Sequence, residues 1–246
     1  MLPLRIAPSL LASNLLNMQA DIRACEDGGA DLLHYDVMDG HFVPPITFGA
    51  DFVKMMKGLT TLPIDVHLMV NNPDHQLELF ADAGADWISV HAEVTPHLHR
   101  TLGRIKQRGC KAGVVLNPAT PLEYAFEVAE SCDFILLMSV NPGYGGQAFI
   151  PSFLRRCERL RSWLDGNDLS HVEIEVDGGI KVDNAKRVIE AGANVLVSGS
   201  GVFPSPGPWP GDEKKGVSVS PGPWPGVPMN DARSSHISAM IQSLRG

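Results

Sequence analysis

The sequence lacks the features that bring a protein to nucleic acid or into a membrane. Acidic residues outnumber basic ones, 28 to 20, which leaves a net charge of −8. Nucleic-acid and anionic-membrane partners need a basic footprint, so we expect neither. The longest strongly apolar run, Phe134 to Val140, has the length of a strand. It falls far short of the ~20 residues that a membrane-spanning helix needs.

Cysteine is scarce and has no metal-type or redox-type spacing. The four cysteines, none of them in a CxxC pair, are Cys25, Cys110, Cys132 and Cys157. Scattered cysteines are typical of reduced side chains, so we expect a cytoplasmic protein. Near the start, Pro3, Arg5 and Pro8 interrupt the apolar stretch that a signal peptide requires. This segment suits a first strand better than a leader.

What the sequence does contain is a repeated alternation of strand-length apolar runs and amphipathic helical stretches. The runs are Arg5–Ser9, Leu32–Asp36, Ile64–Met69, Trp87–His91, Lys111–Leu116, Phe134–Ser139, Val172–Val176 and Val195–Ser198. Strands that alternate with helices pair in parallel through right-handed crossovers. Eight such units in about 250 residues predict an α/β fold with one domain over residues 1–246, a closed (β/α)8 TIM barrel.

A short internal echo indicates that the repeat unit is two strand–helix pairs. Gly29-Ala30-Asp31, Gly84-Ala85-Asp86 and Gly192-Ala193-Asn194 each precede an apolar run, and Ser131-Cys132-Asp133 is a weaker copy. Glycine suits the left-handed position that closes a helix. A doubly wound open sheet is the competing architecture. It usually carries a glycine-rich phosphate turn after its first strand, and none follows Ser9.

One segment, residues 204–228, departs from this alternation. The heptapeptide SPGPWPG occurs twice in it, starting at Ser205 and Ser220. Prolines at this density exclude helix and sheet interior, so we expect a surface insertion before the last helix. A tolerated duplication is the favoured interpretation. A partner that docks on Trp209 and Trp224 is the alternative.

Polar side chains recur at the ends of three predicted strands. Because alternate residues share a face of a strand, three sets point together: His34, Asp36 and Met38; Asp65, His67 and Met69; Glu173, Glu175 and Asp177. If that face is the barrel interior, His34, Asp36, His67 and Asp177 converge at its mouth. Two imidazoles and two carboxylates suit one divalent ion per subunit, Zn²⁺ or Fe²⁺ foremost, with Mn²⁺ or Co²⁺ as further candidates.

The alternative is a purely structural role, in which these polar residues belong to the inner layers of the barrel and hydrogen-bond to one another. One His-x-Asp alone would favour that alternative, whereas three strands with such groups favour a metal site. Met38, Met69 and Met138 would then line it with apolar, polarizable groups, although methionines also serve as core filler.

Three glycine-rich segments follow the sixth, seventh and eighth predicted strands: Asn141–Gln147, Asp177–Ile180 and Ser198–Phe203. Glycines let backbone N–H groups approach an anion closely. TIM barrels often bind phosphate at the loops after strands seven and eight. Each segment alone also occurs as a plain turn, but their order together predicts a phosphate site.

With these motifs the chain resembles the ribulose-phosphate 3-epimerase family, apart from residues 204–228. The motifs are APSLLAS, HYDVMDGHFVPPITFG, DVHLMV, MSVNPGYGGQAF, VDGGI and VSGSGVF, in this order. The resemblance implies a barrel of the ribulose-phosphate-binding type and an isomerase of carbohydrate metabolism. It implies interconversion of D-ribulose 5-phosphate and D-xylulose 5-phosphate in the pentose phosphate pathway, and in the Calvin cycle where carbon is fixed.

The resemblance also implies residue roles. Asp36 and Asp177 would be the acid/base pair at C3, and His34, Asp36, His67 and Asp177 the metal ligands. Substrate contacts would come from Ser9, Met38, His67, Met69, Met138, Gly143, Tyr144, Gly145, Gly146, Asp177, Gly178, Gly179, Ser198, Gly199 and Ser200. Tyr144 stands where the family usually has Phe. We also expect a homo-oligomer.

Three alternatives stay open at this point. The chain could epimerise another ketose phosphate, such as allulose 6-phosphate, with the same motifs. It could be a barrel decarboxylase or isomerase that shares only the phosphate loops, but these lack the two-His, two-Asp set. It could be a phosphosugar-binding scaffold recruited through its insertion, yet a scaffold has no need of both Asp36 and Asp177.

Overall fold

Strands and helices alternate along the chain in a computed structural model, which describes residues 2–203 and 231–246. The strands are β1 (Arg5–Pro8), β2 (Leu33–Met38), β3 (Ile64–Met69), β4 (Trp87–His91), β5 (Lys111–Leu116), β6 (Phe134–Met138), β7 (Glu173–Asp177) and β8 (Val195–Ser198). The helices are α1 (Met18–Asp27), α2 (Ala50–Lys57), α3 (Leu77–Ala83), α4 (Leu98–Gln107), α5 (Glu123–Phe126), α6 (Phe153–Gly166), α7 (Val182–Glu190) and α8 (Asp231–Leu244).

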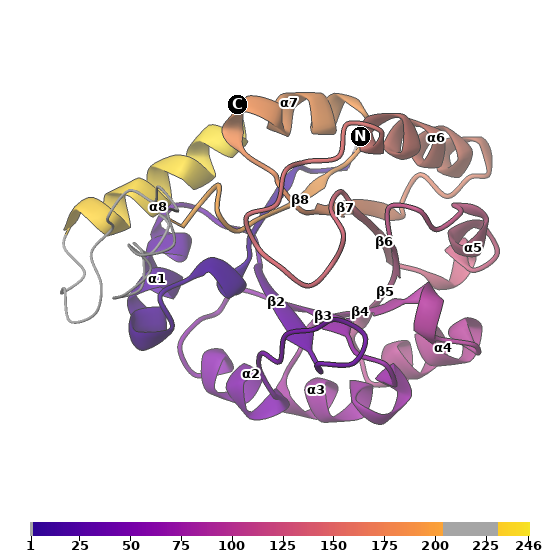
Figure 1. Ribbon diagram of the computed structural model, residues 1–246, viewed down its shortest axis with the longest axis horizontal. Helices are drawn as coiled ribbons and strands as arrows, with labels where there is room; N and C mark the ends of the chain where they lie inside the picture. Colours follow the sequence, from indigo (N-terminus) through magenta and orange to yellow (C-terminus); the bar gives the residue numbers. More distant parts are fainter. Residues whose placement is uncertain (1, 204–230) are drawn as a thin grey trace.

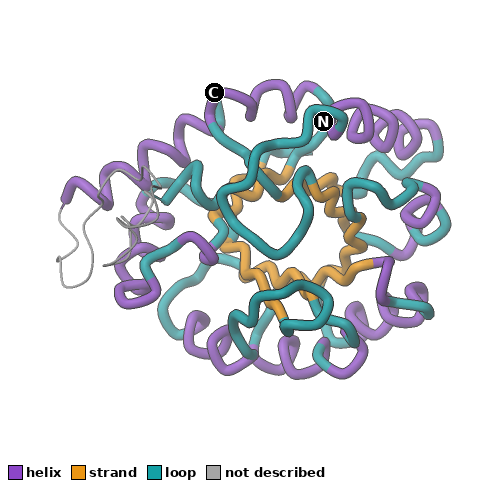
Figure 2. Tube along the Cα trace, viewed as in Figure 1, coloured by secondary structure: helices purple, strands orange, loops and turns teal. Residues whose placement is uncertain are grey.

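The strands form a ring with the helices outside it (Figures 1 and 2). They pair in parallel in the order β1-β8-β7-β6-β5-β4-β3-β2. A parallel bridge between Ser9 and His34 joins β1 to β2 and completes the ring. An open doubly wound sheet would leave two unpaired edges, so the prediction of a (β/α)8 barrel is confirmed.

Helix-closing glycines have the expected backbone in the repeated motif. Gly29, Gly84 and Gly192 have φ values of 80°, 104° and 107°, which lie in the left-handed region. They precede β2, β4 and β8. The repeated motif is therefore a recurrent turn in which a left-handed glycine ends a helix and leads the chain into the next strand.

The sequence placed two strand ends too early. It predicted Leu32–Asp36 and Val172–Val176, whereas β2 continues to Met38 and β7 to Asp177. Asp177 pairs in register with Met138 and Val197. The apolar pattern stops at the polar site residues, but backbone pairing is indifferent to side-chain polarity, so the strands carry these residues to the barrel mouth.

The amino-terminal end of the barrel is filled with side chains. Trp87 packs on Phe134 with ring centroids 4.9 Å apart, and the Lys111 ammonium lies 4.2 Å from the Trp87 ring centroid. Glu173 accepts hydrogen bonds from Arg5 and Lys111 beside them. This plug leaves the opposite end, where the strands finish, for a binding site.

The last helix packs against the barrel wall. Ile237, Ile241 and Leu244 of α8 are buried, and Ser238 donates a hydrogen bond to the Ala24 carbonyl of α1. The predicted insertion, residues 204–228, lies outside the described residues. Among the described helices, none combines the length and apolar character needed to cross a bilayer.

Candidate active site

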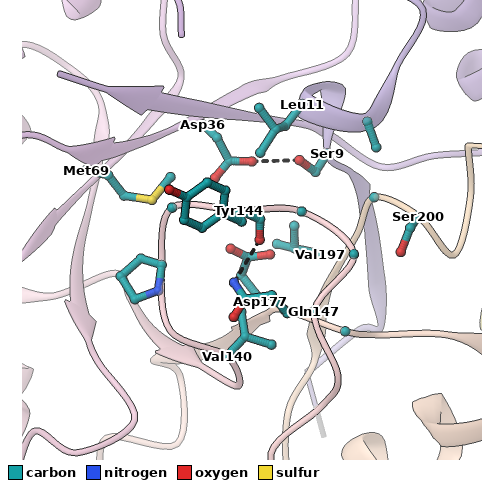
Figure 3. A pocket seen from close by; sticks show the side chains of 18 of the residues that line it. Ser9, Leu11, Asp36, Met69, Val140, Tyr144, Gln147, Asp177, Val197 and Ser200 are labelled. Carbon is teal, nitrogen blue, oxygen red and sulfur yellow. Dashed lines mark hydrogen bonds between the residues drawn. The ribbon is translucent and has the colours of Figure 1, made fainter. Parts of the chain in front are cut away.

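A cavity of about 470 Å³ opens at the carboxyl ends of the strands (Figure 3). This is the end at which TIM barrels place their active sites, and the volume suits a small ligand. Its lining includes Ser9, Leu11, Asp36, Met38, Thr47, Met69, Met138, Gly143, Tyr144, Gly145, Gly146, Gln147, Asp177, Gly178, Gly179, Gly199 and Ser200.

Four side chains from three strands meet at the floor of this cavity and directly beneath it. Ligand atoms of His34, Asp36, His67 and Asp177 all lie within 4.8 Å of one another. Asp36 Oδ1 is 3.4 Å from His34 Nε2 and 3.3 Å from His67 Nδ1. Asp177 Oδ2 is 4.0 Å from the same His67 nitrogen. The strand alternation thus brings together the four residues that the sequence proposed as metal ligands.

One ring nitrogen of His34, Nε2, is buried without a hydrogen-bond partner among the described residues. The other, Nδ1, lies 2.6 Å from Asp65 Oδ2, so Nδ1 carries a proton and Nε2 is the nitrogen that could bind an ion. A buried imidazole nitrogen without a hydrogen-bond partner, beside two carboxylates and a second imidazole, fits a divalent metal ion.

The two carboxylates of the cavity have opposite electrostatics. Burial alone would raise the pKa of Asp36, but the charge of His34 and the close contacts with both histidines outweigh it and hold this pKa below its ordinary value. Burial, reinforced by the charge of Asp36, raises the pKa of Asp177 to about 6. One carboxylate is therefore held ionised while the other readily holds a proton.

A second buried group lies beneath this floor. Glu175 and Asp65 point into the barrel, and Glu175 Oε1 lies 3.4 Å from His34 Nδ1. Burial and the neighbouring charge of Asp65 raise the pKa of Glu175 well above its ordinary value. The charges of Asp36 and Asp65 outweigh burial at His34 and raise its pKa as well. The buried carboxyl groups beneath the floor therefore influence the protonation of His34, which belongs to the cluster above them.

Ser9 fixes the orientation of Asp36. Its hydroxyl donates a hydrogen bond of 2.7 Å to Asp36 Oδ2 (Figure 3). The other oxygen, Oδ1, is left to face the two histidines. Ser9 comes directly after β1 and is the residue that bridges to β2. Closure of the barrel and orientation of this carboxylate are thus coupled through one residue.

The glycine-rich loops after β7 and β8 bring backbone to the cavity wall. Gly178 and Gly179 have φ values of +116° and +66°, and a Cβ on Gly178 would collide with Val140. Ser139 donates a hydrogen bond to the Gly178 carbonyl, and Ser198 donates one to the Ile180 carbonyl. Only glycine permits this close, left-handed path, which suits contact with a phosphate group.

A loop after β6 crosses the mouth (Figures 1 and 2). Gln147 Nε2 donates hydrogen bonds to the carbonyls of Asn141 and Tyr144, at 2.6 and 2.9 Å, and so ties the loop into a closed turn. Tyr144 is 60% exposed at the rim. The side chain of Gln147 therefore shapes this loop.

Most of the predicted substrate-contact residues line the cavity. His67 does not, because it is fully buried below the floor, and Ser198 is buried with its hydroxyl turned to Ile180. Sequence reasoning missed Gln147, Leu11 and Thr47 in the lining. It also missed His91, although period-two alternation along β4 places its side chain inside the barrel with Trp87 and Ser89.

The chain is similar to proteins of known activity. It matches the model of the ribulose-phosphate 3 epimerase family over residues 5–203. It is 50% identical over 200 residues to ribulose-phosphate 3-epimerase of Bacillus subtilis, covering 81% of this chain and 92% of that protein. It is 51% identical over 203 residues to the enzyme of that name from Synechocystis, covering 82% and 88%.

Solved structures with little sequence similarity share the fold. KGPDC from Streptococcus mutans, in complex with D-R5P, has a TM-score of 0.65 at 14% identity, with 100% of this chain and 96% of that chain covered. A tryptophan synthase alpha-subunit mutant from Pyrococcus furiosus also gives 0.65, at 15% identity and full coverage of both chains. These likenesses bear on the barrel alone.

Proposed function

The chain belongs to the ribulose-phosphate 3-epimerase family, and we propose that it interconverts D-ribulose 5-phosphate and D-xylulose 5-phosphate by moving a proton at C3. It is thus an isomerase that acts on a phosphorylated ketopentose. The observation that carries the mechanism is the pairing of Asp36, whose pKa is lowered, with Asp177, whose pKa is raised to about 6.

The two carboxylates divide the proton transfer. Figure 3 shows Asp36 and Asp177 reaching into the same space from opposite sides. In one direction the ionised Asp36 removes the C3 proton, and protonated Asp177 returns a proton to the opposite face of the enediolate. In the other direction the roles exchange. A carboxyl with a pKa of about 6 can serve in both roles near neutral pH.

The loops hold the substrate for this step. Backbone around Gly178, Gly179 and Gly199 receives the phosphate, while Met38, Met69 and Met138 form an apolar wall beside the reacting carbon. This wall limits access of water to the enediolate. Ser9 keeps Asp36 in the orientation that faces the cavity.

The four ligating side chains would hold one divalent ion. His34, Asp36, His67 and Asp177 suit Zn²⁺ or Fe²⁺ best, with Mn²⁺ or Co²⁺ as further candidates. When bound, such an ion supplies Lewis-acid stabilisation of negative charge on the substrate oxygens. The free Nε2 of His34 supports this assignment.

A coupled epimerase assay on stripped and reconstituted protein tests the proposal. The purified protein should convert ribulose 5-phosphate, lose turnover on chelation, and regain it with Zn²⁺, Fe²⁺, Mn²⁺ or Co²⁺. Full turnover in rigorously metal-free protein would refute the metal assignment. Turnover of allulose 6-phosphate but not of ribulose 5-phosphate would refute the substrate assignment.

We propose two further properties, a cytoplasmic location and self-association. The four free cysteines are buried, which suits a reducing cytoplasm. Met55 of α2 and Leu79 of α3 are more than half exposed on neighbouring helices, which suits a contact between copies of the chain. Sedimentation velocity measures the oligomeric state, and a monomer at micromolar concentration would contradict this second property.

A further inference from the structure

A buried histidine of β4 adjoins the cluster and has no part in the proton transfer described above. His91 is fully buried, and its Nε2 lies 2.8 Å from Nε2 of His67. The two rings stack with centroids 5.0 Å apart, and Phe42 covers His91 at a centroid distance of 4.5 Å. On its other side, His91 Nδ1 lies 3.1 Å from Glu93 Oε2. A chain of three side chains therefore runs from the cluster to the rim of the barrel.

The short distance between the two rings restricts where their protons lie. Two imidazole nitrogens at 2.8 Å form a hydrogen bond only if one donates and the other accepts. Two lone pairs, or two N–H groups, would repel each other. Either His67 donates from Nε2 and keeps a lone pair on Nδ1, or His91 donates and the proton of neutral His67 moves to Nδ1.

Glu93 decides between these two arrangements. An ionised carboxylate only accepts hydrogen bonds, so the facing Nδ1 of His91 must carry a proton. Glu93 is itself anchored, because its Oε1 accepts from the Asn117 backbone N–H at 2.8 Å and from the Thr120 hydroxyl. With a proton on Nδ1, neutral His91 presents a lone pair on Nε2. His67 then donates from Nε2, which leaves Nδ1, 3.3 Å from Asp36 Oδ1, as the nitrogen that can bind an ion shared with that carboxylate.

We propose that His91 and Glu93 are positioning residues that hold His67 in the tautomer whose Nδ1 can bind a divalent ion. The proposal rests on the proposed function, since it assigns a role toward the same ion. Asp65 has the matching role for His34, but it fixes the opposite nitrogen, Nε2, as the free one. Groups behind metal-binding histidines commonly set tautomer, orientation and affinity in this way.

Substitutions that alter only the acceptor test the role of His91. In His91→Phe the ring remains but accepts no hydrogen bond, so Zn²⁺ affinity, measured by chelator competition, should fall by about 10–100-fold. In His91→Gln the amide oxygen can accept from His67, and affinity should return toward that of the wild type. Ser89→Ala is the matched control, because Ser89 lies on the same strand, is fully buried, and hydrogen-bonds to no described residue.

A second variant tests the direction set by Glu93 without disturbing the barrel interior. In Glu93→Gln the side-chain amide can donate to His91 Nδ1, which permits the reversed arrangement, so Zn²⁺ affinity should also fall. In the His91→Gln background the same change should add little, because His67 no longer depends on Glu93. Thermal melting checks that each variant is folded. Unchanged Zn²⁺ affinity in both folded variants, His91→Phe and Glu93→Gln, would overturn the proposal.

The tautomer can be read without metal. In ¹⁵N-labelled, metal-free protein, the His67 signal is identified by its loss in His67→Gln. The share of His67 with its proton on Nε2 should be larger in the wild type than in His91→Phe, because His91 accepts from Nε2 whereas Asp36 lies 3.3 Å from Nδ1 and accepts from that nitrogen. An equal share in the two proteins would overturn the proposal. If the wild type bound no Zn²⁺ yet showed the larger share, the metal assignment would fail and the positioning role would stand.

Discussion

At the scale of single residues, the site assigns different tasks to two identical functional groups. Asp36 accepts a hydrogen bond from Ser9 and faces two histidines, and these contacts favour its charged form. Asp177 has burial and a like charge beside it, which favour its protonated form. Since an epimerase must remove a proton from one face and deliver one to the other, this division suits the acid/base roles proposed for the two carboxylates.

Asn substitution removes the acid/base function with little change in shape. Asp36→Asn and Asp177→Asn should each lower turnover of ribulose 5-phosphate by at least ~10²-fold, the usual worth of a positioned acid or base. The coupled assay measures this loss. Because both residues belong to the proposed metal-binding cluster, the metal content of each variant must be measured on the same sample. If a variant keeps its metal and near-normal turnover, the substituted carboxylate is not the acid or base of the reaction.

The raised pKa of Asp177 predicts a pH-dependent penalty in metal-free protein. Its folded-state pKa of about 6 lies above the ordinary value of 3.8 for an aspartate, so the folded state binds its proton more tightly than the unfolded chain does. Stability is therefore lost as pH rises between these values. Asp177→Asn, which resembles the protonated form, should melt on the order of 5–10 °C above the wild type at pH 7.5 and near it below pH 4.

Asp36→Asn supplies the opposite-sign control for that experiment. A lowered folded-state pKa means that ionised Asp36 stabilises the fold above its unfolded value. Its replacement should therefore lower the melting temperature at pH 7.5, with the difference shrinking as pH falls. Equal shifts for Asp177→Asn at both pH values would contradict the electrostatic interpretation.

At the scale of elements, the inward-facing side chains of the strands form layers along the axis of the barrel. Position along a strand sets depth in the barrel, so the last inward residues form the cavity floor and the first ones the plug. Gly113 of β5 illustrates the packing limit, because a Cβ there would overlap the Phe134 ring. The small residue makes room for a large aromatic one on the neighbouring strand.

Two glycine substitutions should have opposite effects on stability. Gly113→Ala forces the Phe134 ring to move within a filled interior and should cost about 1–3 kcal/mol of unfolding free energy. Gly103→Ala is the matched control, since it lies within α4 with open space around its Cβ position. It should stabilise the protein by ~0.5–1 kcal/mol. Urea unfolding measures both, and a neutral Gly113→Ala would show that the plug is loosely packed.

At the scale of the whole molecule, much of the architecture could be predicted from local pattern. Eight apolar runs and the repeated helix-closing glycines specify the barrel, and period-two alternation places His34, His67 and Asp177 together at its mouth. The ends of β2 and β7 could not be predicted, because the apolar pattern stops at polar side chains although the backbone pairing between strands continues past them. His91 could not be recognised either, since its role depends on contact with His67, which is 24 residues away in sequence.

The lining supplied by loops shows the same limit. Leu11, Thr47 and Gln147 reach the cavity through turns whose path has no periodic signature. Gln147 shapes its loop by donating to two carbonyls of that loop, which only the folded backbone reveals. Local pattern therefore predicts the part of the site that strands carry, and tertiary closure determines the rest.

The proline-rich insertion tests whether the barrel is complete without it. Phe203 is buried before the insertion, and α8 packs on α1 after it through Ile237, Ile241 and the Arg233–Asp21 ion pair. Longer connections cost little in loop entropy, ~0.6 kcal/mol per doubling of length, so shortening one should change stability little. Deleting residues 205–226 should leave the melting temperature and most turnover intact. The expected defect is a modest rise in KM for the sugar phosphate, because the cut lies close to Gly199 and Ser200 in sequence. Insoluble protein, or loss of metal binding, would instead make the insertion a structural part of the barrel.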